Sequence, residues 1–222
     1  MILTPVAPDR LRRTLAAFES ALAAPPAGRV FRRIAVPAWG VRARGRDAAL
    51  HHRQALALAA SFGMGLRRGP PQSGAGWDGR TLRTGTEAYV LLHEIAHFQL
   101  AAPSRRRRID FGLGAGPETG DRARAERGAS LDGLAREREE AMASLLGILW
   151  EAALGQPALA SFLDQNWLEG APHRGAARHF STVLAQLAAG GFVTATGRPT
   201  RRLRRSEDAV RGPGRSSLSG PV

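Results

Sequence analysis

The stretch EAYVLLHEIAHFQL, residues 87–100, carries the most specific pattern in this chain. It predicts a largely apolar helix that contains His93, Glu94 and His97 in the pattern H-E-x-x-H. On a helix, positions i and i+4 lie on one face a turn apart, so both imidazoles can bind one metal ion. Glu94 lies beside them, where its carboxylate could take a proton from a metal-bound water. Glu94 is therefore the candidate catalytic residue.

The neighbours of the two histidines argue against a chance match, which is the alternative reading. Apolar residues dominate this helix, namely Val90, Leu91, Leu92, Ile95 and Phe98. Polar side chains on such a helix are costly unless water or a metal ion satisfies them. The context therefore favours a metal site.

A third protein ligand is needed, and it is usually a carboxylate or imidazole from a later helix. The best source is a predicted helix at residues 134–154, which opens with a glutamate-rich cluster. On a helical projection, the face centred on Glu140 also holds Glu137, Ser144, Gly147 and Glu151. This narrow stripe either faces water or packs on a functional partner, and the pattern leaves both open.

The composition limits the kinds of site and partner. The chain has 222 residues and no cysteine, so disulfides, thiolate metal sites and cysteine nucleophiles are excluded. The formal net charge is +13, and all 32 basic Lys+Arg positions are arginine. Aromatic residues are not interleaved with these arginines, which disfavours a nucleic-acid partner. Residues 1–13 contain no apolar core of signal-peptide length, and no apolar run approaches the roughly 18 residues of a membrane span, so we expect a cytoplasmic protein without membrane contact.

The remaining pattern predicts a predominantly helical α+β fold. Further helices are expected at residues 10–24, 47–62, 156–165 and 174–189. Residues 30–36 are rich in β-branched side chains and predict a strand, whereas residues 67–85 predict a loop without an edge strand that could hold a peptide. We expect one domain over residues 1–200, with a small sheet and a zincin-like H-E-x-x-H helix packed on the Glu140 helix.

Two segments lack regular periodicity. Residues 102–131 predict a long irregular active-site loop. Its four arginines at 105–108 are typical of a solvated segment, or, if functional, would dock an acidic macromolecule. Residues 201–222 are basic, rich in Gly, Ser and Pro and poor in apolar residues, which predicts a disordered tail.

An ordered series of motifs resembles the elongation factor P hydroxylases, bacterial enzymes that hydroxylate a modified lysine on that translation factor. The series comprises Tyr89, the H-E-x-x-H pentapeptide, RRIDFG at 107–112, the glutamate cluster at 137–140, NWLEG at 166–170, His179 and RPTR at 198–201. It spans about residues 85–201, and its order is more specific than any one motif. The chain departs from the family at residues 113–117, LGAGP, where an aromatic-rich segment is expected.

The resemblance implies a metal site made by His93, His97 and Glu140, with Glu137 as the next candidate for the carboxylate. It also makes Glu137, Asp110 and His179 candidates for contacts behind the ligands or with the substrate. Two histidines and a carboxylate suit Fe(II) and dioxygen chemistry, and they are equally compatible with Zn(II) hydrolysis. The implied partner is a protein substrate similar to elongation factor P.

Three functions remain open from the sequence. The first is a metal-dependent hydroxylase or oxygenase that acts on a protein side chain. The second is a zinc-dependent hydrolase of the peptidase kind, in which Glu94 is the general base. The third is a non-enzymatic adaptor that docks through its arginines.

Overall fold

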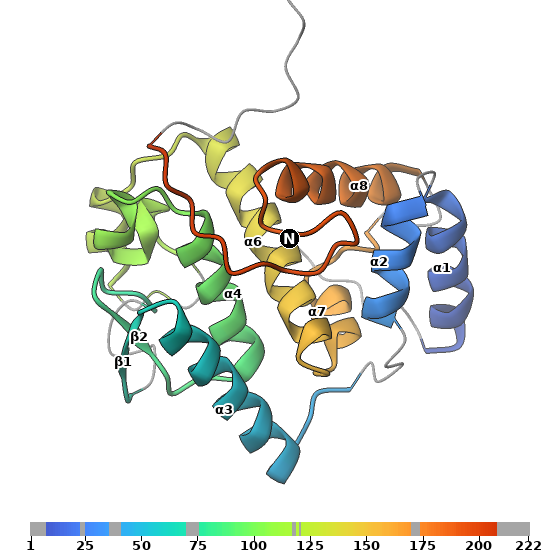
Figure 1. The fold of residues 1–222 in the computed structure, drawn as a ribbon, viewed down its shortest axis with the longest axis horizontal. Helices are drawn as coiled ribbons and strands as arrows, with labels where there is room; N and C mark the ends of the chain where they lie inside the picture. The colour runs from blue at the N-terminus through green and yellow to red at the C-terminus, as the bar shows by residue number, and fades with distance from the viewer. Residues whose placement is uncertain are drawn as a thin grey trace, which may run out of the picture.

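The computed structural model describes residues 8–22, 25–35, 41–69, 76–116, 119, 121–169 and 174–207. It has a predominantly helical α+β fold with a small parallel sheet, as predicted (Figure 1). The helices are α1 (Pro8–Ala21), α2 (Pro25–Ala35), α3 (Gly45–Ser61), α4 (Ala88–Leu100), α5 (Arg122–Arg127), α6 (Gly133–Ala153), α7 (Ala158–Asp164) and α8 (Arg174–Ala189). The strands are β1 (Gly65–Arg67) and β2 (Thr81–Arg83), and η2 (Arg105–Arg107) and η3 (Ile109–Gly112) are short 3-10 turns.

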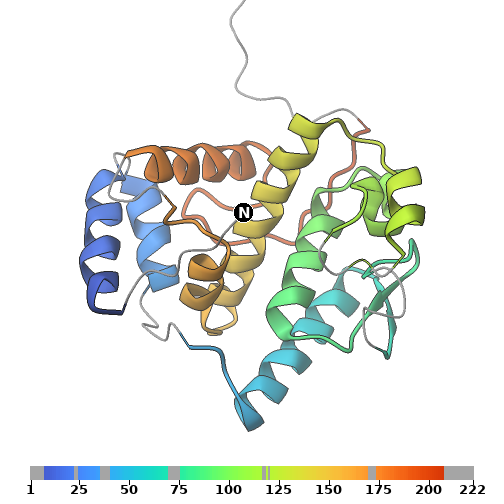
Figure 2. The ribbon, with the colours of Figure 1, turned by 180° about the vertical axis from the view of Figure 1, so that it is seen from behind.

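Helices α4 and α6 pack side by side at the centre of the molecule (Figures 1 and 2). Large apolar side chains bury most of both surfaces, among them Leu91, Leu92, Ile95, Leu145, Leu146, Ile148 and Leu149. The start of α6 is fixed by Asp132, whose carboxylate accepts a hydrogen bond from the Ala135 amide at 2.8 Å. Several polar residues of these two helices, namely His97, Gln99, Glu139 and Glu151, are therefore buried against protein.

The remaining helices hold this pair from two sides. Helix α3 packs on α4, while α7 and α8 pack on α6 and are covered by α1 and α2 (Figure 2). An aromatic cluster fills the second side, with Phe18, Phe31, Phe162, Trp167 and Phe180 in contact. Burying these rings removes large apolar areas from water, which holds α6 in a fixed position relative to α4.

The strand predicted at residues 30–36 is wrong, because residues 30–35 belong to α2; residue 36 lies outside the described residues. Val30, Phe31 and Ile34 are buried on one face, and Arg29 and Arg32 are exposed on the other. A strand would place Arg32 on the same side as Val30 and Ile34, inside the core. The helical period separates the arginines from the apolar residues, so burial overrides the β propensity of the segment.

The predicted loop at residues 67–85 contains the short strand β2 and the last residue of β1, so the prediction of a loop throughout is wrong. Strand β2 pairs in parallel with β1, with Leu82 opposite Leu66. On its other side, the amide of Arg83 donates to the Gly76 carbonyl at 2.9 Å, and the Asp78 amide donates to the Thr81 carbonyl at 3.2 Å. Both edges of β2 are therefore occupied by this chain. Residues 70–75 of the predicted loop lie outside the described residues.

The irregular segment predicted at 102–131 contains η2, η3 and α5 where it is described. The prediction that the four arginines at 105–108 are solvated is wrong for Arg105 and Arg106. Arg105 is buried and forms an ion pair with Glu139. Arg106 is half-buried and donates from Nε to the Phe98 carbonyl at 2.9 Å. Buried guanidinium groups require such partners, which a sequence run cannot reveal.

The disordered tail is predicted to begin at Arg201, but the chain is held against α4 beyond this residue. The segment up to Glu207 crosses α4 as an extended chain (Figure 1). The buried amide of Gln99 donates to the Thr200 and Arg202 carbonyls at 2.8 and 3.0 Å, and the Gln99 carbonyl accepts from the Arg204 amide at 2.9 Å. The rest of the predicted tail, residues 208–222, lies outside the described residues. Among the helices that are described, none has the length and apolar character to cross a bilayer.

Candidate metal centre

His93 and His97 present their Nε2 atoms to each other from successive turns of α4. The two atoms are 3.0 Å apart, and the rings stand nearly perpendicular with centroids 4.6 Å apart. His97 is buried, with 3% of its surface exposed, and His93 is half-buried. The i, i+4 spacing therefore brings the two nitrogen atoms to one point, as predicted.

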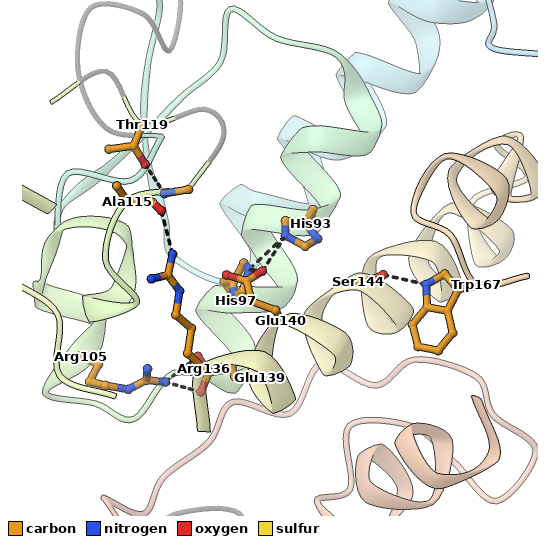
Figure 3. A network of polar contacts seen from close by, with 11 residues as sticks. His93, His97, Arg105, Ala115, Thr119, Arg136, Glu139, Glu140, Ser144 and Trp167 are labelled. Carbon is orange, nitrogen blue, oxygen red and sulfur yellow. Dashed lines mark hydrogen bonds and ion pairs between the residues drawn. The ribbon is translucent and has the colours of Figure 1, made fainter. Parts of the chain in front are cut away.

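Glu140 reaches the same point from α6 (Figure 3). Its Oε2 atom lies 3.6 Å from Nε2 of His93 and 3.3 Å from Nε2 of His97. A metal–nitrogen bond is about 2.1 Å, so neighbouring ligand atoms lie about 3.0 Å apart at a right angle and about 3.4 Å apart at a tetrahedral angle. The separations of 3.0 and 3.3 Å fall within this range, and the separation of 3.6 Å is slightly longer. His93, His97 and Glu140 could therefore hold a divalent metal ion.

The electrostatics of the three groups favour a cation at this point. Burial opposes the charged form of His97, but Glu140 and, more weakly, Glu94 and Glu139 raise its pKa to about 9. Burial likewise opposes ionisation of Glu140, yet the two histidines hold the pKa of that carboxyl well below its usual range. The pKa of His93 is lowered, chiefly by burial. The site thus has a negative potential that stabilises positive charge.

The Nδ1 atoms of both histidines have no acceptor among the described residues. Both atoms are buried. Histidines that bind metals usually donate this second N–H to a carboxylate or carbonyl, which fixes the ring. The Nε2 atoms, which lie beside Glu140, are the ones available for a metal ion.

A cavity of about 240 Å³ opens beside the three groups. Its walls are formed by Gly76, Tyr89, Val90, His93, Glu94, His97, Asp110, Phe111, Leu113, Gly114, Gly116, Thr119, Glu140 and Gln165. Glu94 therefore faces the same space as the candidate ligands. A Cβ atom at Gly76 would lie only 3.4 Å from the carboxyl carbon of Glu94, so a glycine there leaves room for the carboxylate. Among the described residues on these walls, the side chains include carboxylates and no arginine.

Asp110 shapes one wall of this cavity. It has a positive φ of 42°, and its carboxylate accepts from the Thr119 hydroxyl at 2.6 Å and the Trp77 amide at 3.3 Å. Burial raises the pKa of Asp110. The adjoining Phe111 ring stacks on the His97 ring with centroids 5.8 Å apart. Asp110 thus lines the cavity and precedes the residue whose ring covers His97, so contacts behind the ligands and contacts with a substrate both stay open for it.

Two predicted candidates do not reach the cavity. Glu137 is exposed on α6 and is not among the residues that line it, so it is not placed as the third ligand. His179 is exposed on α8, and its ring stacks on Trp167 with centroids 5.3 Å apart. Glu139, the neighbour of Glu140, points instead to Arg105 (Figure 3). Only one glutamate of the cluster therefore faces the two histidines.

Several residues that line the cavity could not be predicted from the sequence. Thr119 lies in the irregular segment, and Gln165 follows α7, far from the pentapeptide along the chain. Arg136 helps to hold this segment in place, because its Nη2 atom donates to the Ala115 carbonyl at 2.7 Å (Figure 3). Such contacts depend on the tertiary fold, and no short sequence motif predicts them.

Ser144, Gly147 and Glu151, on the same face of α6 as Glu140, contact neighbouring elements. Ser144 accepts a hydrogen bond from Trp167 Nε1 at 2.8 Å, and Gly147 lies against the backbone of His93. Glu151 is buried, with Nη1 of Arg42 3.7 Å from its Oε2 atom. Burial raises the pKa of Glu151 from 4.5 to about 7, although Ser161 and Arg42 oppose this rise.

The raised pKa of Glu151 predicts a pH dependence of stability. The folded protein disfavours the ionised carboxylate, so this residue lowers the free energy of unfolding as pH rises from about 4.5 to about 7. Glu151→Gln removes this titration. We expect the free energy of unfolding of the variant, relative to that of the wild type, to be up to about 3 kcal/mol higher at about pH 8 than at about pH 5. Chemical denaturation of both proteins at the two pH values measures this, and an equal difference at both would contradict it.

No protein-family model matches the chain, and neither a curated protein nor a solved structure shows significant similarity to it. The resemblance to the elongation factor P hydroxylases therefore rests on the motifs quoted above. The geometry of the site stands independently of that resemblance.

Proposed function

We propose that this protein is a metal-dependent hydroxylase that acts on a protein side chain, with Fe(II) held by His93, His97 and Glu140. The observation that carries the proposal is the convergence of two imidazoles and one carboxylate on the wall of an open cavity. Among the described residues, no fourth side chain joins this group. A set of three ligands leaves positions for dioxygen and substrate, whereas a closed structural site uses four protein ligands.

Bound ferrous iron in such a ligand set supplies the activation of dioxygen. The chain itself supplies the position and the surroundings of the reaction. Glu94 and Asp110 give the cavity an acidic lining without arginine, which suits a neutral or cationic side chain better than an acidic one. The modified lysine of elongation factor P, suggested by the motif resemblance, is a group of this kind. The packing of α4 on α6 also supports the zincin-like arrangement expected from the sequence.

A zinc-dependent hydrolase is the second candidate, because Glu94 faces the same cavity as the three ligands. In that reaction Glu94 would take a proton from the attacking water. The pairing of β2 on both edges weighs against a peptidase, which commonly holds its substrate as an added strand. The hydroxylase therefore remains the preferred proposal.

Metal analysis separates these functions. The protein is purified without added metal, both under nitrogen and in air, and its metal content is measured by elemental analysis. We expect about one iron per chain in the anaerobic preparation. Stoichiometric zinc in both preparations would favour the hydrolase, and the absence of any bound metal after reconstitution would contradict both enzymes and leave the adaptor.

Replacing Glu94 by glutamine tests the role of its carboxylate. The change keeps the size of the side chain and removes only its ability to accept a proton at neutral pH, so we expect metal content equal to that of the wild type. Under the hydrolase alternative, it lowers the turnover of a peptide or ester substrate by about 10²- to 10⁴-fold. Loss of metal from Glu94→Gln would show that Glu94 is itself a ligand.

A further inference from the structure

A second cavity, of about 410 Å³, lies beside α6 on the side that Glu139 faces. Its charged wall residues are Arg105, Arg108, Arg138, Arg204, Glu139 and Glu207. Among the described wall residues, four guanidinium groups and two carboxylates leave two positive charges unbalanced. The metal centre, in contrast, has an acidic lining, so the two cavities favour ligands of opposite charge.

Both carboxylates on this wall are already engaged. Glu139 accepts from Nη2 of the buried Arg105. Glu207 accepts from the amide of Ser104 at 3.1 Å and from its hydroxyl. The two carboxylates therefore already accept hydrogen bonds from other groups of the protein. They leave some N–H groups of the wall arginines without an acceptor among the described residues.

Two of these guanidinium groups carry buried N–H groups without acceptors. Arg105 is 6% exposed, and its Nη1 atom has no partner among the described residues. Arg138 donates from Nε to the Gln186 side chain at 3.2 Å, but its Nη2 atom also lacks a partner there. Buried charged donors without acceptors are costly, and an oxyanion that reaches them removes this cost.

We propose that this cavity binds a small dianionic oxyanion, either a phosphate or a dicarboxylate group. In the bound state Arg105 and Arg138 turn their unpaired N–H groups to its oxygen atoms, and Arg108 and Arg204 neutralise the remaining charge. Guanidinium forks suit both anions, because each offers pairs of oxygen atoms at the spacing of the two N–H groups. A dianion also balances the two excess positive charges, and the volume is that of a small-molecule site.

Calorimetric titration of the full-length protein with inorganic phosphate, and separately with succinate, tests the proposal. The protein is first treated with a chelator, so that neither anion can bind through a metal ion in the neighbouring centre, and the buffer is kept at low salt. We expect saturable binding of one anion per chain. Tighter phosphate binding indicates a ligand with a phosphate group, and tighter succinate binding indicates a dicarboxylate. Both support the site, whether or not the metal centre proves catalytic.

The variants Arg138→Met and Arg108→Met should each weaken binding by about tenfold to a hundredfold. Arg108 is exposed, so its replacement leaves the fold intact. Arg46→Met removes an equal charge from the exposed surface of α3 and should leave binding unchanged. Gln186→Ala removes the contact to Arg138 but keeps its charge, and should retain most of the affinity. Absence of saturable binding for both anions, or equal weakening by Arg46→Met, would overturn the proposal.

Discussion

Replacing Glu140 by alanine is expected to strip the metal ion from the protein. Glu140 supplies the only carboxylate oxygen of the three-residue group, at 3.3 and 3.6 Å from the two imidazole nitrogens. If a complete set of four ligands contributes roughly 10–16 kcal/mol, one ligand contributes about 3 kcal/mol, which corresponds to more than a hundredfold in affinity. His93→Ala and His97→Ala should have effects of the same size. Equilibrium dialysis followed by elemental analysis measures each loss.

The matched control for this experiment is Glu137→Ala. Glu137 lies one turn earlier on α6 and has the same charge, but it is exposed and outside the cavity. Its replacement should leave the metal content unchanged, because an exposed carboxylate beyond the ligand sphere contributes little. If Glu140→Ala retained the metal while Glu137→Ala lost it, the third ligand would be Glu137. Retention by both variants would place the third ligand outside the glutamate cluster.

The two histidines could be predicted because their geometry is local. A helix fixes the relation of positions i and i+4 whatever the rest of the chain does, so His93 and His97 converge as expected. The carboxylate lies on another helix, and its choice depends on how α6 is turned. The sequence pattern limited the third ligand to one face of the helix predicted at residues 134–154. The choice of Glu140 within that face came from the motif resemblance.

Long-range contacts account for the predictions that were wrong. Residues 30–36 have strand-forming side chains, but the burial of Phe31 and Ile34 against other helices makes the described part, residues 30–35, helical. Arg105 belongs to a run that is typical of solvent, yet its partner Glu139 lies 34 residues away. Nothing near either residue in the sequence indicates this pair. The same limit applies to the arginine-lined cavity, whose walls come from η2, α6 and the segment at 200–207.

Gly147→Leu is expected to lower the stability of the protein by about 3 kcal/mol or more. Gly147 lies where α6 meets α4, and a Cβ atom there would approach Cα and N of His93 at 3.2 and 3.3 Å and the Leu92 carbonyl oxygen at 3.4 Å. These contacts are with backbone atoms of a buried helix, so no side-chain rotation relieves them. A leucine therefore forces α4 and α6 apart, and overpacking of this kind costs about 1–3 kcal/mol and occasionally more.

The same displacement changes the metal centre. The backbone atoms that must move belong to His93 on α4, whereas Glu140 lies on α6, so the distance between these two ligands increases. We expect the metal affinity of Gly147→Leu to fall by about tenfold or more, although no ligand has been replaced. Gly133→Ala is the matched control, since Gly133 is on the same helix and has nothing within 4 Å of its Cβ position. It should be neutral or stabilising by up to about 1 kcal/mol, as glycine-to-alanine changes on helices usually are. Chemical denaturation and metal titration of both variants test the argument. A stable Gly147→Leu protein with wild-type metal affinity would show that the close contact of the two helices does not set the distance between the histidines and Glu140.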